Sequence, residues 1–253
     1  MKWYFKLILP TLFITGWEIA AILINNEYIL PSAQYILSIL IKPFTDIFGY
    51  SSLVENSLVS IYRVSLGFIV ACSISVPLGI LFGRYQVLEE LGDWMIQILR
   101  PIPPIAWVPL SMAWFGIGLA AIEFIIVIGC IFPILVNTID GVKRVKKIWI
   151  ETAKIYQANE WQIMSKVIVP AAGPAIWSGL RVGFGIAWMS VVAAEMMPGT
   201  MQGLGNLIMQ TFALGQINVV VAGMIAIGVI GIMMDQFFQY VQKRMFGWEV
   251  LDK

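Results

Sequence analysis

The stretch LAAIEFIIVIGCIFPILVNTI (residues 119–139) decides the fold class of this chain. It is 21 residues long and carries a single charged side chain, Glu123. A helix needs about 20 consecutive, mostly apolar residues to cross the hydrocarbon core of a bilayer, because each residue adds only about 1.5 Å of rise. The stretch therefore predicts a membrane-spanning helix.

The rest of the chain has the same character. Of its 253 residues, 59% are hydrophobic and only 12% are charged, whereas soluble domains carry about 25% charged residues. The short alternating strands of a transmembrane barrel are absent from the sequence. We predict an all-α fold, a polytopic membrane helix bundle that forms one domain over residues 1–253. The six predicted spans lie at about residues 7–24, 58–82, 94–114, 119–139, 175–196 and 219–240.

The first span follows Lys2 and Lys6 and therefore resembles a secretory signal peptide. Trp17 and Glu18, however, interrupt the end of the apolar run, where a signal peptide has the small residues of its cleavage site. We favour an uncleaved first span.

The third span contains RPIPPIAWVP (residues 100–109), whose prolines must break or bend a helix. Broken backbone at membrane depth persists only where protein buries it or where it lines a cavity. Residues 94–114 are therefore either internal to the bundle or begin at the membrane surface.

The cations are distributed unevenly over the loops. If the N-terminus is cytoplasmic, Lys42 is the one cation in an outer segment, whereas twelve fall in inner segments, which is a strong orientation signal under the positive-inside rule. The chain is thus predicted to be a multi-pass protein of the cell membrane with both termini in the cytoplasm. The twelve are Lys2, Lys6, Arg84, Lys143, Arg144, Lys146, Lys147, Lys154, Lys166, Lys243, Arg244 and Lys253.

A charged insert, ETAKIYQANEWQIMSKVIVPAAGP (residues 151–174), separates the fourth span from the fifth and is cytoplasmic in this topology. Apolar residues recur at helical spacing before and within it, and Asn159 with Gln162 resembles a capping box that starts a second helix. On that helix Trp161, Met164 and Ile168 are predicted to form one stripe, and Pro170 and Pro174 to end it.

The residues predict two short helices over about residues 145–170 and leave two hypotheses open. The apolar positions that do not pack on the span ends could dock into a groove of a partner protein. Alternatively, the pair of helices could lie as an amphipathic hairpin on the membrane lipid.

This insert resembles the EAA loop of binding-protein-dependent ABC importer permeases. That loop begins Glu-Ala-Ala, with a Gly six residues after the Glu, a branched aliphatic residue ten further on and a Pro three beyond that. Gln157 in place of Gly is the main departure, and it bears on the tight turn between the two helices. The matching positions here are Glu151, Thr152, Ala153, Gln157, Val167 and Pro170.

Two further stretches strengthen the resemblance. RPIPPIAWVPLSMAWFGIG (residues 100–118) and GLRVGFGIAWMSVVAAEMM (residues 179–197) are similar to the permeases for nitrate, taurine, alkanesulfonate and bicarbonate, some relatives of which move vitamin precursors. The resemblance implies a permease subunit for a small anion, a sulfonate-like solute or a vitamin precursor. It also implies a second permease subunit, expected to be an identical copy, and an extracytoplasmic solute-binding protein.

The resemblance further implies a coupling helix, on which an ATP-binding cassette ATPase acts through Glu151, Thr152, Ala153, Gln157, Ala158 and Pro170. The chain has no GxxxxGK[ST] phosphate loop, so the partner ATPase is expected to bind ATP and this chain no cofactor. Glu151 would orient the coupling helix or pair with a cation of the ATPase; alternatively, it is a first-turn carboxylate favoured by the helix dipole.

Other function classes fit less well. The chain has no histidine, which argues against metal sites and against an enzyme, and its net charge of +1 gives no sign of nucleic-acid binding. An ion-coupled secondary transporter is the alternative, since Glu123 and the proline-rich third span suit one, although it leaves the insert unexplained.

Two charged residues of the spans are candidates for the substrate pathway. Arg63 lies about one turn inside the second span, where it could meet an anion or form a structural pair with a carboxylate; we favour the pair. Glu195 lies near the outer end of the fifth span.

Overall fold

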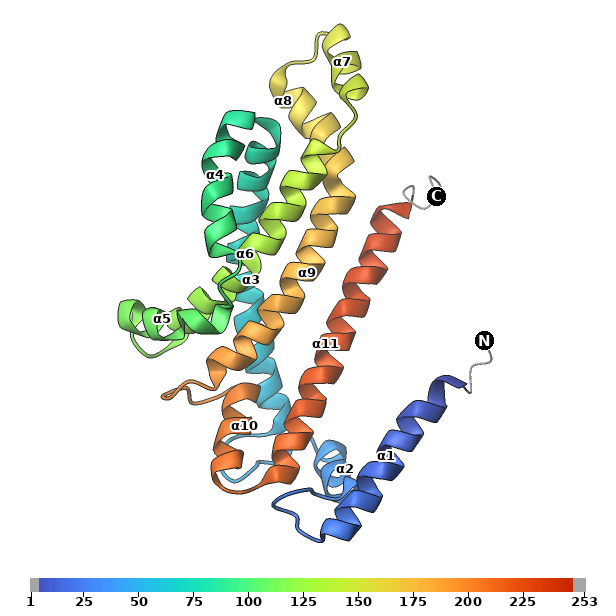
Figure 1. Cartoon of the computed structure of the whole chain (residues 1–253), viewed down its shortest axis with the longest axis vertical. Helices are drawn as coiled ribbons and strands as arrows, with labels where there is room; N and C mark the ends of the chain where they lie inside the picture. The colour runs from blue at the N-terminus through green and yellow to red at the C-terminus, as the bar shows by residue number, and fades with distance from the viewer. Residues whose placement is uncertain (1–4, 248–253) are drawn as a thin grey trace. The chain divides into compact units, whose positions relative to one another are not determined.

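The computed structural model describes residues 5–247, so Lys2 and Lys253 lie outside the described residues (Figure 1). Every regular element within residues 5–247 is helical, which confirms the predicted all-α class. The elements are α1 (Phe5–Ile24), α2 (Ala33–Ile41), α3 (Leu53–Arg84), α4 (Gln86–Leu99), the 3-10 turn η1 (Pro104–Trp107), α5 (Val108–Phe115), α6 (Leu119–Lys143), α7 (Lys147–Ile155), α8 (Glu160–Ile163), the π-helical turn η2 (Met164–Ile168), α9 (Val169–Glu195), α10 (Leu204–Ala213) and α11 (Ile217–Met245).

Four of the described helical runs are long and apolar enough to cross a membrane, and they correspond to the second, fourth, fifth and sixth predicted spans. The first predicted span is represented by the shorter apolar helix Ile8–Ile24. Residues 94–114, the third predicted span, do not form one continuous helix, which confirms the prediction that their prolines break or bend it. Here α4 ends at Leu99, and η1 and α5 follow only after Pro101 and Pro103, whose missing N–H groups interrupt the helical hydrogen bonds.

The chain divides into two compact units, which we describe separately. The first unit consists of the described part of Met1–Ile61 with Glu195–Ile230, and the second of Tyr62–Ala194 with the described part of Gly231–Lys253. Helices α3, α9 and α11 each contribute residues to both units.

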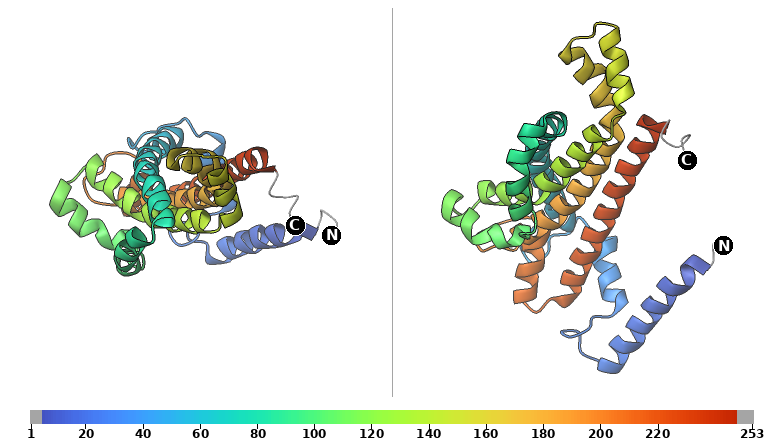
Figure 2. Two further views of the ribbon diagram at one scale, coloured as in Figure 1. Left: turned by 90° about the horizontal axis from the view of Figure 1, so that it is seen from above. Right: turned by 45° about the horizontal axis from the view of Figure 1, so that its top comes forward.

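Within the second unit, α6 packs closely against both α3 and α9. A Cβ added at Gly79 of α3 would lie 2.6 Å from Cβ of Thr138, and one added at Gly179 of α9 would lie 2.6 Å from Cβ of Asn137. These glycines let the helix backbones approach, as small residues do in membrane helix pairs. Figure 2 shows the ribbons of these helices from two further directions.

The helix that follows the α7–α8 turn is continuous from Glu160 to Glu195, so the prediction that Pro170 and Pro174 end it is wrong. Pro170 is the second residue of α9 and directly follows the π-helical turn η2. A π turn widens the helix locally and shifts its hydrogen bonds. The proline ring and its missing N–H are therefore accommodated, and the chain enters the membrane-spanning part of α9 without a loop.

Within the first unit, Glu18 lies in α1 and caps another helix. Its Oε2 accepts a hydrogen bond from the backbone N–H of Ala33, the first residue of α2, at 2.8 Å. Trp17 donates from Nε1 to the carbonyl of Pro31 at 3.0 Å. The two residues that interrupt the signal-peptide pattern thus fasten α1 to the start of α2.

Candidate functional site

The turn between α7 and α8 has the geometry of a Schellman motif. The N–H of Ala158 donates to the carbonyl of Ala153 at 3.0 Å, and the N–H of Gln157 donates to the carbonyl of Lys154 at 2.9 Å. Gln157 adopts φ +57°, the left-handed conformation that this motif requires and that glycine adopts most easily. The tight turn is therefore retained although Gln157 stands at the position where the EAA pattern has Gly.

The predicted capping box at the start of α8 is confirmed. Oδ1 of Asn159 accepts from the N–H of Gln162 at 2.8 Å, and Oε1 of Gln162 accepts from the N–H of Asn159 at 2.9 Å. Both bonds satisfy N–H groups that the first turn of a helix leaves without partners. The cap fixes the direction in which the chain leaves the turn.

One side of this coupling segment (residues 147–168) is anchored in the second unit. Ile163 and Ile168 are each 1% exposed and lie in a hydrophobic cluster with Val142, Val145, Ala172 and Ile176. Ala153 and Ala158 pack against the same cluster. The segment is thus a braced extension of α6 and α9.

The other side of the coupling segment is apolar and exposed. Trp161 is 76% exposed whereas Ile168 is 1% exposed, so the prediction that Trp161, Met164 and Ile168 share one stripe is wrong; the π turn η2 widens the helix between Trp161 and Ile168. We call the exposed large residues of this side the coupling patch. It comprises Ile148, Trp149, Ile155, Tyr156 and Trp161, which are 47–83% exposed.

Glu151 is the fifth residue of α7 and therefore does not lie in its first turn. The interpretation that the helix dipole favours this carboxylate does not hold, since that effect fades beyond the first turn. Glu151 is exposed, and its carboxylate forms no ion pair or hydrogen bond with the residues whose side chains the structure describes, 8–247. Thr152, by contrast, donates from Oγ1 to the carbonyl of Ile148 at 2.8 Å and is turned back onto the helix.

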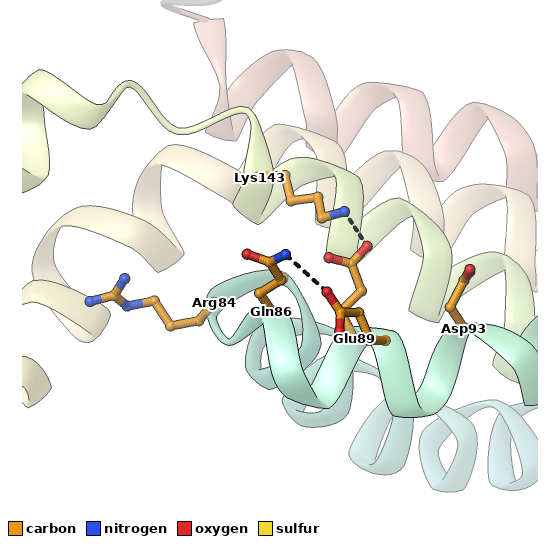
Figure 3. Close-up of a pocket in the computed structure, with 7 residues that line it drawn as sticks. Arg84, Gln86, Glu89, Asp93 and Lys143 are labelled. Atoms are coloured by element: carbon orange, nitrogen blue, oxygen red, sulfur yellow. Dashed lines mark hydrogen bonds and ion pairs between the residues drawn. The ribbon is translucent and has the colours of Figure 1, made fainter.

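One ion pair joins the end of α3 to the coupling segment and another joins the end of α6 to α4; Figure 3 shows the second of these pairs. Nη2 of Arg84, the last residue of α3, lies 2.9 Å from Oε2 of Glu160 at the start of α8. Lys143 at the end of α6 pairs with Glu89 of α4 across a polar pocket. Sequence analysis missed both pairs, because partners 76 and 54 residues apart leave no spacing signal.

Arg63, one of the two predicted pathway residues, lies near a carboxylate. It is half-buried on α3 and interacts electrostatically with Glu123 of α6. A Cβ added at Gly67, one turn along α3, would lie 2.7 Å from Oε2 of Glu123, so the carboxylate fits closely against that helix. Both carboxylate oxygens of Glu123 are buried and accept no hydrogen bond from the described residues, so the structural pair and the pathway role of Arg63 both stay predictions.

Glu195, the other predicted pathway residue, is fully buried in the first unit. Its Oε2 accepts hydrogen bonds from Oγ of Ser60 at 2.7 Å and from the N–H of Gly205 at 3.1 Å. The N–H of Leu204 donates to Oγ of Ser60 at 2.9 Å, and that of Gly203 to Oδ1 of Asn56 at 2.8 Å. Side chains of α3 and α9 thus cap the N-terminus of α10.

The comparisons with known proteins agree with this geometry. Residues 75–247 match the model of a protein family described as the binding-protein-dependent transport system inner membrane component. The chain belongs to this family. The match includes the whole coupling segment of the permease and the ion pair of Arg84 with Glu160 that joins this segment to α3.

Curated relatives align over most of the permease. A putative ABC transporter permease of Methanocaldococcus jannaschii is 49% identical, with 98% of this chain and 93% of the relative covered. A putative aliphatic sulfonates transport permease of Bacillus subtilis is 33% identical, with 97% and 88% covered. A bicarbonate transport permease of Synechococcus elongatus is 32% identical, with 81% and 74% covered.

A solved structure shows the same fold. The inward-facing methionine ABC transporter MetNI superimposes with a TM-score of 0.68 at 17% identity, covering 76% of the permease and 95% of the compared chain. The predicted helical membrane bundle and the predicted family are therefore confirmed.

Proposed function

We propose that this chain is the permease subunit of an ABC importer for a small anion and that a separate ATPase drives it through the coupling segment. A second copy of the chain would complete the pore, and an extracytoplasmic solute-binding protein would deliver the substrate. The family membership supports the class of transporter. The coupling segment supports the site of coupling.

The division of the coupling segment into two sides carries the proposal. Ile163 and Ile168 anchor one side in the hydrophobic cluster, while Tyr156 and Trp161 leave the other side with aromatic rings that are 83% and 76% exposed. Aromatic residues at the centre of an interface are the usual anchors of protein–protein binding. A segment built in this way can transmit a push from a docked partner to α6 and α9.

Glu151 complements this surface. It is an exposed carboxylate without an ion-pair partner in the described chain, flanked on α7 by residues of the coupling patch. A cation of the ATPase could therefore pair with it at no cost to a bond within the permease. We place this surface and both termini in the cytoplasm, because the excess of Lys and Arg in the inner segments supports that orientation.

The substrate class follows from the relatives. Their names give aliphatic sulfonates and bicarbonate, both of which are small oxyanions at neutral pH. We therefore propose a small oxyanion in preference to a vitamin precursor. The ion-coupled alternative makes no use of the coupling segment, and it predicts uptake that a protonophore abolishes while ATP remains present.

Co-purification with the ATPase tests the coupling surface. Glu151→Lys reverses the charge of the exposed carboxylate, and Trp161→Ala removes the more exposed of the two tryptophan rings of the coupling patch. We expect each to lower the ATPase recovered with the tagged permease at least tenfold, because anchors of this kind typically contribute about 2 kcal/mol or more. Glu27→Lys is the matched control, since Glu27 is an exposed carboxylate in the loop between α1 and α2.

The lipid-surface hypothesis predicts a different outcome. If the coupling patch binds membrane, both variants keep the ATPase and weaken only the attachment of the segment to anionic vesicles. Full recovery of the ATPase with both variants, together with normal ATP-dependent uptake, would remove the proposed coupling role.

A further inference from the structure

A cavity of about 250 Å³ lies in the second unit, beside the proline-rich break between α4 and α5. Its lining comes from the end of α4, the segment before η1, α6 and α9. The lining residues on which the argument depends are Arg100, Pro103, Gly129, Asn137, Val182 and Ile186. The cavity is smaller than the roughly 300–1,000 Å³ of pockets for drug-sized ligands, so it suits a solute of a few non-hydrogen atoms.

The cavity lies deep along the helices that line it. On α6 it is bordered by residues between Ile128 and Asn137, near the middle of Leu119–Lys143. On α9 it is bordered by Val182 and Ile186, near the middle of Val169–Glu195. Arg100 follows α4, whose 14 residues rise about 21 Å from Gln86, which lies two residues after the Arg84 that pairs with Glu160 of the coupling segment.

Arg100 is therefore a cation at membrane depth, where an ionised side chain costs several kcal/mol unless it is paired or hydrated. Its guanidinium is exposed and forms neither an ion pair nor a side-chain hydrogen bond with the residues that the structure describes. Arg84 and Arg181, by contrast, each have a carboxylate partner, at 2.9 Å and 2.6 Å.

The carboxylates of α4 do not serve as an ion-pair partner for Arg100. Asp93 lies two turns before Arg100 on α4, and its Oδ2 accepts from Nε2 of Gln97 at 2.5 Å. Arg100 is one of the residues that line the cavity, and its guanidinium carries the fork of N–H donors that binds oxyanions in a bidentate manner.

Two other features of the cavity favour a ligand. Asn137 uses one N–H of its amide for the carbonyl of Pro133, at 2.8 Å, and carries a second N–H. The backbone at Pro103 and Pro104 leaves the regular helix at membrane depth, which is characteristic of transporter segments that line a binding site.

We infer that this cavity binds the transported solute, a small oxyanion such as a sulfonate or bicarbonate, with Arg100 as its charged ligand and Asn137 as a hydrogen-bond donor. The inference rests on the proposed function, because it assumes an anionic substrate. It assigns substrate recognition to residues other than Arg63 and Glu195.

Uptake by the whole importer tests the inference. The permease, its ATPase and its binding protein are reconstituted in vesicles, and ATP-dependent uptake of radiolabelled bicarbonate and ethanesulfonate is measured. Replacing the guanidinium by an amide in Arg100→Gln should lower uptake about tenfold to a hundredfold, the range that corresponds to one charge-assisted hydrogen-bonded contact. Arg100→Lys should retain part of the activity. Arg244→Gln, which removes an exposed arginine at the end of α11, is the matched control and should leave uptake unchanged.

A binding measurement separates this inference from the proposed function. Purified permease is titrated with bicarbonate, ethanesulfonate and chloride at constant ionic strength while its thermal unfolding midpoint is followed. We expect one of the oxyanions to raise the midpoint, chloride to have no such effect, and Arg100→Gln to abolish the rise.

The outcomes are distinct. Wild-type importer without ATP-dependent uptake of any solute that its binding protein carries would contradict the proposed function. Active wild-type importer with unimpaired uptake in Arg100→Gln would overturn the inference alone, as would an oxyanion-dependent rise that persists in this variant. An equal rise with chloride would show a general ionic effect and would also overturn it.

Discussion

Glu195, at the end of α9, and Arg100, which follows α4, are both charged residues, and they differ in what surrounds them. Glu195 is fully buried and accepts hydrogen bonds from Ser60 and from the backbone of α10. Arg100 is exposed beside a cavity, and its side chain has no hydrogen-bond or ion-pair partner among residues 8–247. The comparison teaches that a charge at membrane depth can serve the fold or a ligand, and that its hydrogen bonds distinguish the two.

The physical reason is the cost of leaving a buried polar group without a partner, about 1–3 kcal/mol for a neutral donor or acceptor and more for a charge. Glu195 has its partners within the chain, so removing it should damage folding first. Arg100 gains a partner only when an anion enters, so removing it should damage binding first. Four substitutions test this contrast, in order of decreasing effect on stability.

Gly203→Ala should have the largest effect on folding. A Cβ at Gly203 would lie 2.3 Å from Cδ of Glu195, and the residue has φ +120°, which side chains other than glycine rarely adopt. Overpacking and backbone strain each cost about 1–3 kcal/mol, so the free energy of unfolding should fall by about 2–6 kcal/mol. The unfolding midpoint in detergent measures this loss.

Gly185→Ala is the control for Gly203→Ala, because a Cβ at Gly185 would meet no atom within 4 Å. Equal stability of the two variants would mean that α10 is not held closely against Glu195. The interpretation that Glu195 serves the fold would then be wrong.

Glu195→Ala should have the next largest effect. It leaves the hydroxyl of Ser60 and the N–H of Gly205 without their acceptor, at about 1–3 kcal/mol for each donor. Glu195→Gln keeps an acceptor oxygen of the same reach and should lose less. Unfolding midpoints of the two variants check the order. A Glu195→Ala variant that folds like the wild type but fails to transport would instead support the predicted role of Glu195 in the substrate pathway.

The sequence predicted those features of the permease that depend on local chemistry. The capping box of Asn159 and Gln162 could be predicted because both of its hydrogen bonds lie within four residues. The break after Leu99 could be predicted because proline removes a backbone donor wherever it stands. Long apolar runs revealed the spans in the same way, because the bilayer sets their length.

Features that depend on contacts between residues far apart in the sequence, or on the folded helix geometry, could not be predicted. The cap of α10 joins Asn56 and Ser60 to residues about 145 positions later, and no spacing rule connects them. The π-helical turn η2 widens the helix after Trp161 and directly before the helical segment that contains Pro170, whereas a regular helix predicts one stripe and a break. Arg100 was passed over because its importance lies in a cavity, which a single sequence does not reveal.

Gln157→Gly tests a residue that is exposed, as Arg100 is, but whose backbone is strained. Gln157 has φ +57° in the turn of the coupling segment, and the left-handed conformation costs non-glycine residues about 1–2 kcal/mol. Glycine relieves this strain but loses about 0.5–1 kcal/mol through its freedom in the unfolded chain. The variant should therefore be more stable by about 1 kcal/mol or less, as measured by thermal unfolding, and Gln157→Ala should show no gain. A loss of stability in Gln157→Gly would mean that the side chain of Gln157 itself holds the turn.

Arg100→Ala should have the smallest effect on stability, although we expect it to impair transport. The side chain is exposed and forms no hydrogen bond or ion pair within the described chain, and substitutions at such positions usually change stability by less than about 0.5 kcal/mol. Removing a cation from membrane depth could even stabilise the permease, because the cost of its desolvation disappears. Unfolding midpoints of Arg100→Ala and Arg181→Ala should therefore diverge, since Arg181 forms an ion pair with Asp235 at 2.6 Å. A loss above about 1 kcal/mol in Arg100→Ala would show that Arg100 supports the fold as Glu195 does, and low transport in this variant could then be explained by misfolding alone.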